Sequence, residues 1–191
     1  DEQLVCISHQ GPFLGRLDSW ETGTTAPGSL QGRGSRGNIR IKGFAENVAD
    51  LTGVPQAVTF SPDGRRCLLV TYAESLSLGE PTEFQLQVFD VAPFRPVYPT
   101  PTRVFDELTR VVFSPAGETF LTASENTRAR LWNAQTGAPF WQPWQQKGVV
   151  EWAAYSPNGR YVATSGTLLN GQGCARVWDV ATGYPVTPEL S

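Results

Sequence analysis

The sequence predicts an all-β fold assembled from repeated sheets. Three observations lead to this prediction. A Ser-Pro-x-Gly turn follows a short apolar segment three times, at Ser61, Ser114 and Ser156. Each copy is followed by a strand that ends in an aromatic residue and then Asp or Asn. Apolar residues do not recur with the period of an amphipathic helix over any useful window, and short strands separated by turns are typical of all-β folds.

The turns define three repeat units. The first runs from Ala57 to Val91, the second from Arg110 to Gly137 and the third from Ala153 to Gly183. In each turn Pro fixes φ at the second position and Gly supplies a positive φ near the end. Short apolar strands follow the turns. The first unit is the longest, and we expect its extra residues, Ala73 to Phe84, to form an insertion.

These units resemble WD repeats. The resemblance is carried by FSPDG from Phe60 to Gly64, by ARLWNAQTG from Ala129 to Gly137 and by ARVWDVATG from Ala175 to Gly183. A WD repeat is about 40 to 45 residues long and makes the four strands of one propeller blade. The resemblance therefore implies an all-β fold, a β-propeller fragment of about three to four four-stranded blades. It covers residues 54–191 well.

The resemblance also assigns structural roles. The residues expected to hold each blade together are Phe60, Phe89, Asp90, Phe113, Trp132, Asn133, Tyr155, Trp178 and Asp179. The Gly-His dipeptide of the family is missing from each unit, and Lys147-Gly148 stands near its place in the last one. Asn126 replaces the usual Asp of the tight turn. The family's buried Asp-His-Ser-Trp hydrogen-bond network is therefore not expected to form intact.

The predicted domain organisation has four parts. Residues 1–53 are expected to form a degenerate or truncated blade with a Gly/Arg-rich loop. Leu17 to Gly23 resembles the end of a unit, but Gly37 to Ile41 resembles the strand just before the Trp, and both cannot be the same strand. Residues 54–105 form a blade with the insertion, and residues 106–146 and 147–191 form one blade each. Closed propellers have about four to eight blades. We therefore expect either a part of a larger propeller or a ring closed by a second copy.

Five residues are candidates for partner binding. Trp152 lies on the first strand of its unit, at the position that Arg110 and Ala57 occupy in theirs. In WD repeats this position tends to project onto the face where partners bind, and exposed Trp and Arg are typical anchors. Glu151 lies beside Trp152. Trp141 and Trp144 lie in a Pro-flanked connection between blades. Packing between blades is the alternative role for these aromatic and Arg side chains.

The composition argues against several other classes of protein. A net charge of −3 gives no attraction to nucleic acid. The basic residues near the N-terminus, Arg33, Arg36, Arg40 and Lys42, suit a solvated loop and strand. The three Cys residues share no CxxC spacing and the single His lies near only one of them, so they do not suit a structural zinc site of about four ligands, and we expect no metal and no cofactor. No apolar run is long enough to cross a membrane.

The sequence therefore predicts a non-enzymatic scaffold that presents loops and first-strand residues to a protein or peptide. The tails GAPFWQPW and GYPVTPELS resemble bacterial tandem WD repeats. Such repeats often adjoin signalling domains, so the alternative is a regulatory or sensor module of a larger enzyme such as a serine/threonine kinase. A propeller enzyme with a central site is disfavoured, because the first strands read VTF, VVF and AAY.

Two expectations concern the cell and the gene. The odd, sparse set of Cys residues favours a reducing compartment, and we expect a cytoplasmic protein. The chain begins at Asp1 and contains no Met, so we expect it to be processed or excised from a longer protein.

Overall fold

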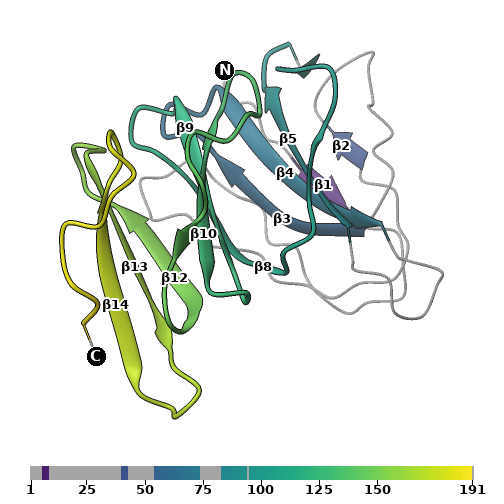
Figure 1. Cartoon of the computed structure of the whole chain (residues 1–191). Helices are drawn as coiled ribbons and strands as arrows, with labels where there is room; N and C mark the ends of the chain where they lie inside the picture. The colour runs from purple at the N-terminus through teal and green to yellow at the C-terminus, as the bar shows by residue number, and fades with distance from the viewer. Residues whose placement is uncertain (1–5, 9–39, 43–53, 74–82, 94, 191) are drawn as a thin grey trace.

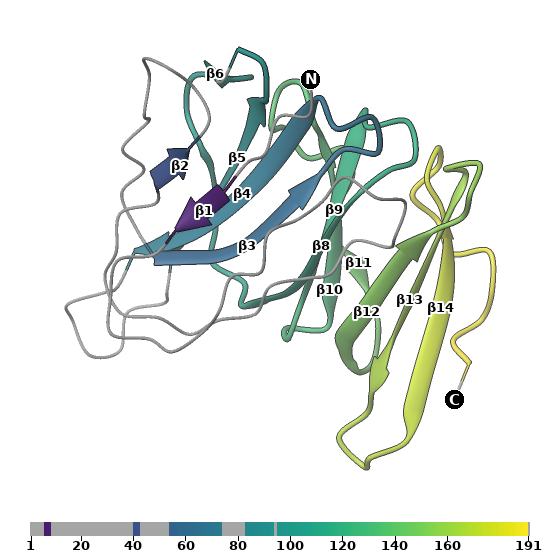
Figure 2. The same cartoon turned by 180° about the vertical axis from the view of Figure 1, so that it is seen from behind.

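Antiparallel sheets make up the described part of the chain. The computed structural model describes residues 6–8, 40–42, 54–73, 83–93 and 95–190. Figures 1 and 2 show three large sheets standing side by side in chain order, and the sheets do not close into a ring. The predicted all-β architecture of successive sheets is confirmed.

The three sheets, numbered along the chain, have closely similar plans. Sheet 1 contains β3 (Val54–Phe60), β4 (Arg66–Ala73), β5 (Glu83–Asp90), β6 (Arg95–Pro96) and β7 (Thr102–Val104). Sheet 2 contains β8 (Leu108–Phe113), β9 (Thr119–Ser124), β10 (Arg128–Asn133) and β11 (Trp144–Gln145). Sheet 3 contains β12 (Val149–Tyr155), β13 (Tyr161–Thr167) and β14 (Gly173–Asp179). Single bridges at Pro185 and Leu190 continue sheet 3 beyond β14.

The N-terminal part of the prediction falls mostly outside the described residues. A small pair of strands, β1 (Cys6–Ser8) and β2 (Arg40–Lys42), joins Ile7 to Ile41. The segment from Leu17 to Gly23 and the Gly/Arg-rich loop lie outside the described residues. The predicted insertion needs a correction at its ends: Ala73 belongs to β4, and Glu83 and Phe84 belong to β5. These ends pair with each other across the two strands, so only residues 74–82 lie between them.

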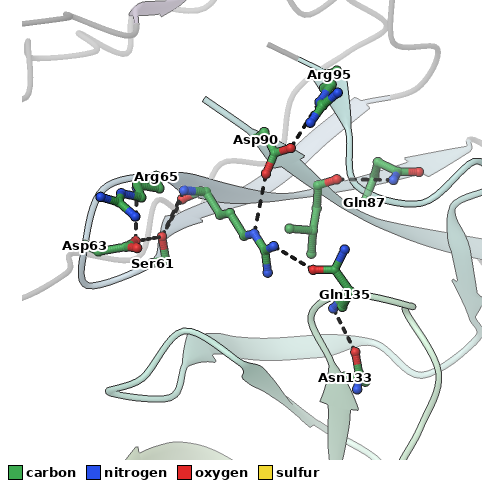
Figure 3. Close-up of polar contacts among 10 residues, drawn as sticks. Ser61, Asp63, Arg65, Gln87, Asp90, Arg95, Asn133 and Gln135 are labelled. Atoms are coloured by element: carbon green, nitrogen blue, oxygen red, sulfur yellow. Dashed lines mark hydrogen bonds and ion pairs between the residues drawn. The ribbon is translucent and has the colours of Figure 1, made fainter. Parts of the chain in front are cut away.

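The Ser-Pro-x-Gly turns connect the first and second strands of each sheet. In the first turn, the Ser61 hydroxyl donates a 2.6 Å hydrogen bond to the Asp63 carboxylate, which also accepts the Arg65 amide (Figure 3). The Ser61 bond comes first among the causes that lower the pKa of Asp63. Gly64 and its counterparts Gly117 and Gly159 have positive φ, which side chains disfavour. The predicted turn chemistry is present in all three sheets.

Two apolar clusters hold the sheets together. One joins sheet 1 to sheet 2 and contains Leu68, Leu86 and Val88 of sheet 1 with Phe120 and Trp132 of sheet 2. The other lies between the outer face of sheet 2 and the inner face of sheet 3. Burial of apolar surface at about 25 cal/mol per Å² is the main driving force for such packing. Each sheet is therefore stabilised mainly by its neighbours.

Polar contacts accompany the first of these interfaces. Arg66 of sheet 1 makes a 3.5 Å ion pair with Asp90 and donates a 2.6 Å hydrogen bond to Gln135 of sheet 2. Asp90 also pairs with Arg95 at 3.2 Å, and Gln135 lies beside Asn133 (Figure 3). The Asn133 side chain accepts the Gln135 amide and thereby fixes the turn that reaches sheet 1.

Candidate functional site

The first strands of the three sheets lie next to one another. Strand β8 contacts β3 on one side and β12 on the other. Each of these strands has a β-bulge at the same place, at Gln56, Thr109 and Glu151. The residues that follow are Ala57, Arg110 and Trp152, so the register confirms that these three positions are equivalent. Bulges re-aim the side chains around them and are frequent near functional sites.

The bulge residues connect neighbouring sheets. Gln56 donates a hydrogen bond of 3.3 Å to the Leu108 carbonyl, and the Thr109 hydroxyl donates one of 2.5 Å to the Val150 carbonyl. In both cases the acceptor is the residue just before the next bulge. The repeated contact sets the spacing of the first strands and holds the following residues in place.

Arg110 and Trp152 meet across the boundary between sheets 2 and 3. The guanidinium carbon of Arg110 lies 3.6 Å from the centre of the Trp152 ring, a close cation–π contact. The Arg110 Nε donates a 3.1 Å hydrogen bond to the Ala153 carbonyl, which fixes the plane of the guanidinium group. Trp152 is 56% exposed even so. The two residues that the sequence singled out separately therefore form one rigid, exposed pair.

The half-buried Arg110 guanidinium has lost part of its hydration. This desolvation lowers its pKa from the usual arginine value. The described ion pairs of the chain do not include Arg110. Glu151 is exposed beside Trp152 and is likewise outside those pairs. We call Arg110, Glu151 and Trp152 the first-strand surface.

Trp144 does not belong to an accessible surface. Its side chain is 4% exposed and stacks on Trp178, with ring centres 5.3 Å apart and planes within 2°. Trp144 therefore packs between sheets 2 and 3, where a partner cannot reach it. We leave Trp144 out of the proposed surface, because its position fits the alternative role of packing between blades.

Trp141 also joins sheets 2 and 3. Its indole Nε1 donates a 3.1 Å hydrogen bond to the Val180 carbonyl, and its ring lies against Gly183. Tyr98 of sheet 1 lies against Gly137 of sheet 2 in the same way. Trp141 is 41% exposed, but its polar atom and one face already serve the neighbouring sheet. We therefore leave it out of the surface as well.

The residues assigned to the repeat framework occupy matching places. Phe60, Phe113 and Tyr155 end the first strands, and Phe89, Trp132 and Trp178 lie in the third strands, followed by Asp90, Asn133 and Asp179. The Tyr155 hydroxyl and the Thr119 hydroxyl share a 3.1 Å hydrogen bond between sheets. Burial raises the pKa of Tyr155, so it stays neutral at any physiological pH.

A polar network that the sequence analysis missed lies inside sheet 3. The Trp178 Nε1 donates to the Thr164 hydroxyl at 2.9 Å, and that hydroxyl donates to the Gln146 amide oxygen at 2.7 Å. The Gln146 amide nitrogen donates to the Cys174 sulfur at 3.2 Å. The sequence signal for this bond was the Thr in the second strand of each WD40 sheet, since the Trp132 Nε1 donates to the Thr122 hydroxyl in the same way. This network differs from the one that the resemblance implies.

Other chemistry is sparse among the described residues. They contain no group of three or more His, Cys, Asp and Glu residues able to hold a metal ion. Cys67 and Cys174 are both buried free thiols. Burial raises the pKa of the Cys67 thiol to about 12, so its reactive thiolate form is scarce at neutral pH. No described helix is long and apolar enough to span a membrane.

Comparison with known proteins agrees with the geometry of sheets 2 and 3. Residues 100–133 and 145–179 match the family described as WD40: WD domain, G-beta repeat. Residues 100–179 contain WD40 repeats. No curated protein matches the chain. The first match runs from β7 to β10 and the second from the last residue of β11 to β14, so each matched repeat begins in a strand that pairs with the sheet before it.

WD40 repeat domains generally act as protein-interaction scaffolds and are usually non-catalytic. Sheet 1 lies before most of the matched residues, but it shares the bulge, the Ser-Pro turn and the strand order of the two WD40 sheets. The first-strand surface lies at the junction of the two WD40 repeats, because Arg110 belongs to the first match and Trp152 to the second.

Proposed function

We propose that the chain is a non-enzymatic scaffold that holds a protein or peptide partner on the first-strand surface. The observation that carries the proposal is the rigid Arg110–Trp152 pair, which is fixed by a backbone hydrogen bond and yet leaves the Trp ring largely exposed. Trp and Arg are enriched among the few residues that carry most of the binding energy at protein interfaces. A side chain that is already ordered loses less conformational entropy when it binds.

Selection of peptides against the immobilised chain tests this proposal. A random peptide library displayed on phage is enriched on the wild-type chain, and the recovered peptides are measured against Trp152→Ala. We expect binding to weaken about 30-fold or more, since anchors of this kind are worth roughly 2 kcal/mol or more. Circular dichroism should show an intact fold, because the Trp152 side chain contributes little to either core cluster.

Leu169→Ala is the matched control. Leu169 is a fully exposed large apolar residue in the turn between β13 and β14. Its loss should leave peptide binding unchanged. Equal binding to the wild type and to Trp152→Ala would contradict the first-strand surface, and failure to recover any peptide would count against the scaffold function itself.

We also propose that another blade covers the outer face of sheet 3, supplied by a larger propeller or by a second copy of the chain. Leu190 is 54% exposed, whereas Trp144, at the equivalent place in sheet 2, is buried by sheet 3. Repeat units of this kind bury their faces only against neighbours. The isolated chain should therefore self-associate in sizing with light scattering, and a sharp monomer peak would contradict the proposal.

The cellular setting is likewise a proposal. The free thiols of Cys67 and Cys174 support a reducing compartment, and hence a cytoplasmic protein. The tails after the third strands support a bacterial signalling protein, in which the scaffold would regulate an attached enzyme such as a kinase. The full-length coding sequence tests this, because the glycine-rich and catalytic loops of a kinase are recognisable directly.

A further inference from the structure

We propose that the Arg110–Trp152 pair of the first-strand surface recognises an acidic side chain, Asp or Glu, that is flanked by an apolar residue in the partner peptide. This inference rests on the proposed function and adds to it the chemistry of the partner. The carboxylate would bind the guanidinium group of Arg110, and the apolar neighbour would cover the exposed part of the Trp152 ring.

The donors of Arg110 support the carboxylate. A guanidinium group carries five N–H donors, and the Nε–H is the one that bonds the Ala153 carbonyl. The two terminal nitrogens of Arg110 have no hydrogen bond to any residue that the structure describes. These nitrogens form the fork that binds a carboxylate through two parallel bonds. The group is also half buried, where the attraction to an opposite charge is screened less than in bulk water.

Other arginines of the chain are used differently. Arg66, Arg95, Arg128 and Arg160 each lie within 3.2 to 3.7 Å of an Asp carboxylate. Arg110, like Arg130 and Arg176, is partly buried and lies in none of the described ion pairs, so an anion from a partner would complete its environment.

The remaining Arg–Trp contacts of the WD40 sheets give a second contrast. Arg130 and Arg176 lie 5.3 and 5.0 Å from the rings of Trp132 and Trp178. Both of those rings are buried, so no partner can share them. The Arg110 contact is closer, at 3.6 Å, and its ring is open to solvent. Aromatic surface beside a fixed cation suits a ligand that is apolar at one end and anionic at the other.

The sequences of selected peptides test this chemistry directly. Peptides are selected on the full chain as above, and those that depend on Trp152 are sequenced. We expect Asp or Glu next to an apolar residue to be enriched over the unselected library. The best sequence is then made as an acetylated and amidated peptide, so that a terminal carboxylate cannot contribute, together with its Glu→Gln or Asp→Asn form.

The expected effect of removing the peptide carboxylate is a loss of affinity of roughly 10- to 100-fold, or about 1.4–2.7 kcal/mol, the size expected for a lost hydrogen bond to a charged group. Arg110→Gln should weaken the binding of the acidic peptide by a similar factor and leave the binding of its amide form unchanged. Arg110→Lys should recover only part of the affinity, because lysine keeps the charge but loses the fork. Arg103→Gln removes an exposed arginine of sheet 1 that pairs with Glu83, and it should change nothing.

Three outcomes would overturn the inference. The selected peptides could depend on Trp152 but show no acidic enrichment, or they could bind equally well after the carboxylate is removed. Acidic peptides could also bind Arg110→Gln as tightly as the wild type, which would place the recognition elsewhere. In each of these cases the scaffold function would stand and the proposed partner chemistry would fail. If the recovered peptides did not depend on Trp152, the first-strand surface would fail as the binding site together with the partner chemistry, and if no peptide were recovered, the scaffold function would fail as well.

Discussion

The outer faces of sheets 2 and 3 have the same backbone plan but different side chains. Leu121 pairs with Leu131 in sheet 2 at the place where Ala163 pairs with Val177 in sheet 3. Leu121 and Leu131 are buried under sheet 3. Ala163 is exposed and Val177 is half buried. The face that another described sheet covers is therefore built from larger apolar residues than the face that is open.

The same difference continues toward the edge of the sheets. Trp144 pairs with Ala129 in sheet 2, and Leu190 pairs with Ala175 in sheet 3. Both sheets nevertheless carry the third-strand Trp, the Asp or Asn that follows it and the Gly of the next turn. The repeated motif thus determines how each sheet folds, and the residues between the motif positions determine how tightly it packs on the next sheet.

The largest effect is expected when a charge is placed on each face in turn. Leu131→Asp would bury a carboxylate in the cluster between sheets 2 and 3, so we expect a loss of more than about 3 kcal/mol of unfolding free energy. Val177→Asp is the matched change on the face that no described sheet covers, and in the monomeric chain it should cost about 1 kcal/mol or less. Urea denaturation followed by tryptophan fluorescence measures both. Equal losses would show that the two faces are covered alike.

The sequence predicted the repeats better than it predicted their surfaces. The Ser-Pro turns and the third-strand aromatics recur along the chain, so local spacing was enough to find the sheets and to align Arg110 with Trp152. Whether a side chain is exposed depends on the neighbouring sheet, which local spacing does not describe. Trp144 lies near the end of one unit and Trp152 near the start of the next, yet Trp144 is buried against Trp178 and Trp152 is open.

The local spacing of residues could not predict the contacts between sheets either. The stacking of Arg110 on Trp152 joins residues of different units, and it follows from the lateral distance between β8 and β12. The role of Gln146 in the buried network depends on a side chain from the connection reaching Thr164 in β13. No motif marks Gln146. The family motif expected near this place is the Gly-His dipeptide, which this unit lacks.

A smaller effect is expected where a glycine meets the neighbouring sheet. Gly183 has a φ of +74°, and an added Cβ would lie 2.9 Å from the Trp141 ring. Gly183→Ala should therefore cost about 3 kcal/mol, the sum of left-handed strain of about 1–2 kcal/mol and a displaced Trp141. Gly171→Ala is the control, because Gly171 has a φ of +82° but nothing within 4 Å of the added atom.

The difference between the two glycine variants, measured by thermal unfolding, isolates the contribution of the contact between sheets 2 and 3. If Gly171→Ala lowers the Tm as much as Gly183→Ala does, strain alone explains the loss. Trp141 would then contribute nothing to joining the two sheets.

The smallest effect on stability is expected from the turns that follow the third strands of the two WD40 sheets. In sheet 3 the Asp179 carboxylate accepts the Thr182 and Ala181 amides, each at 3.0 Å, and the Thr182 bond comes first among the causes that lower its pKa below the ordinary value of 3.8. In sheet 2 the neutral Asn133 side chain accepts the Thr136 and Gln135 amides, at 3.0 and 2.8 Å. The same turn is thus built once with a charge and once without.

A lowered pKa in the folded state means that Asp179 stabilises the fold above about pH 4 and loses that contribution as the pH falls through its folded pKa. Asp179→Asn should keep the turn, as Asn133 does in sheet 2, and should flatten the fall of Tm between about pH 4 and pH 2. The reciprocal change, Asn133→Asp, should make that fall steeper, and Tm measured against pH tests both. Parallel curves for the wild type and both variants would mean that the charge of Asp179 adds nothing to the hydrogen bonds that its neutral counterpart already makes.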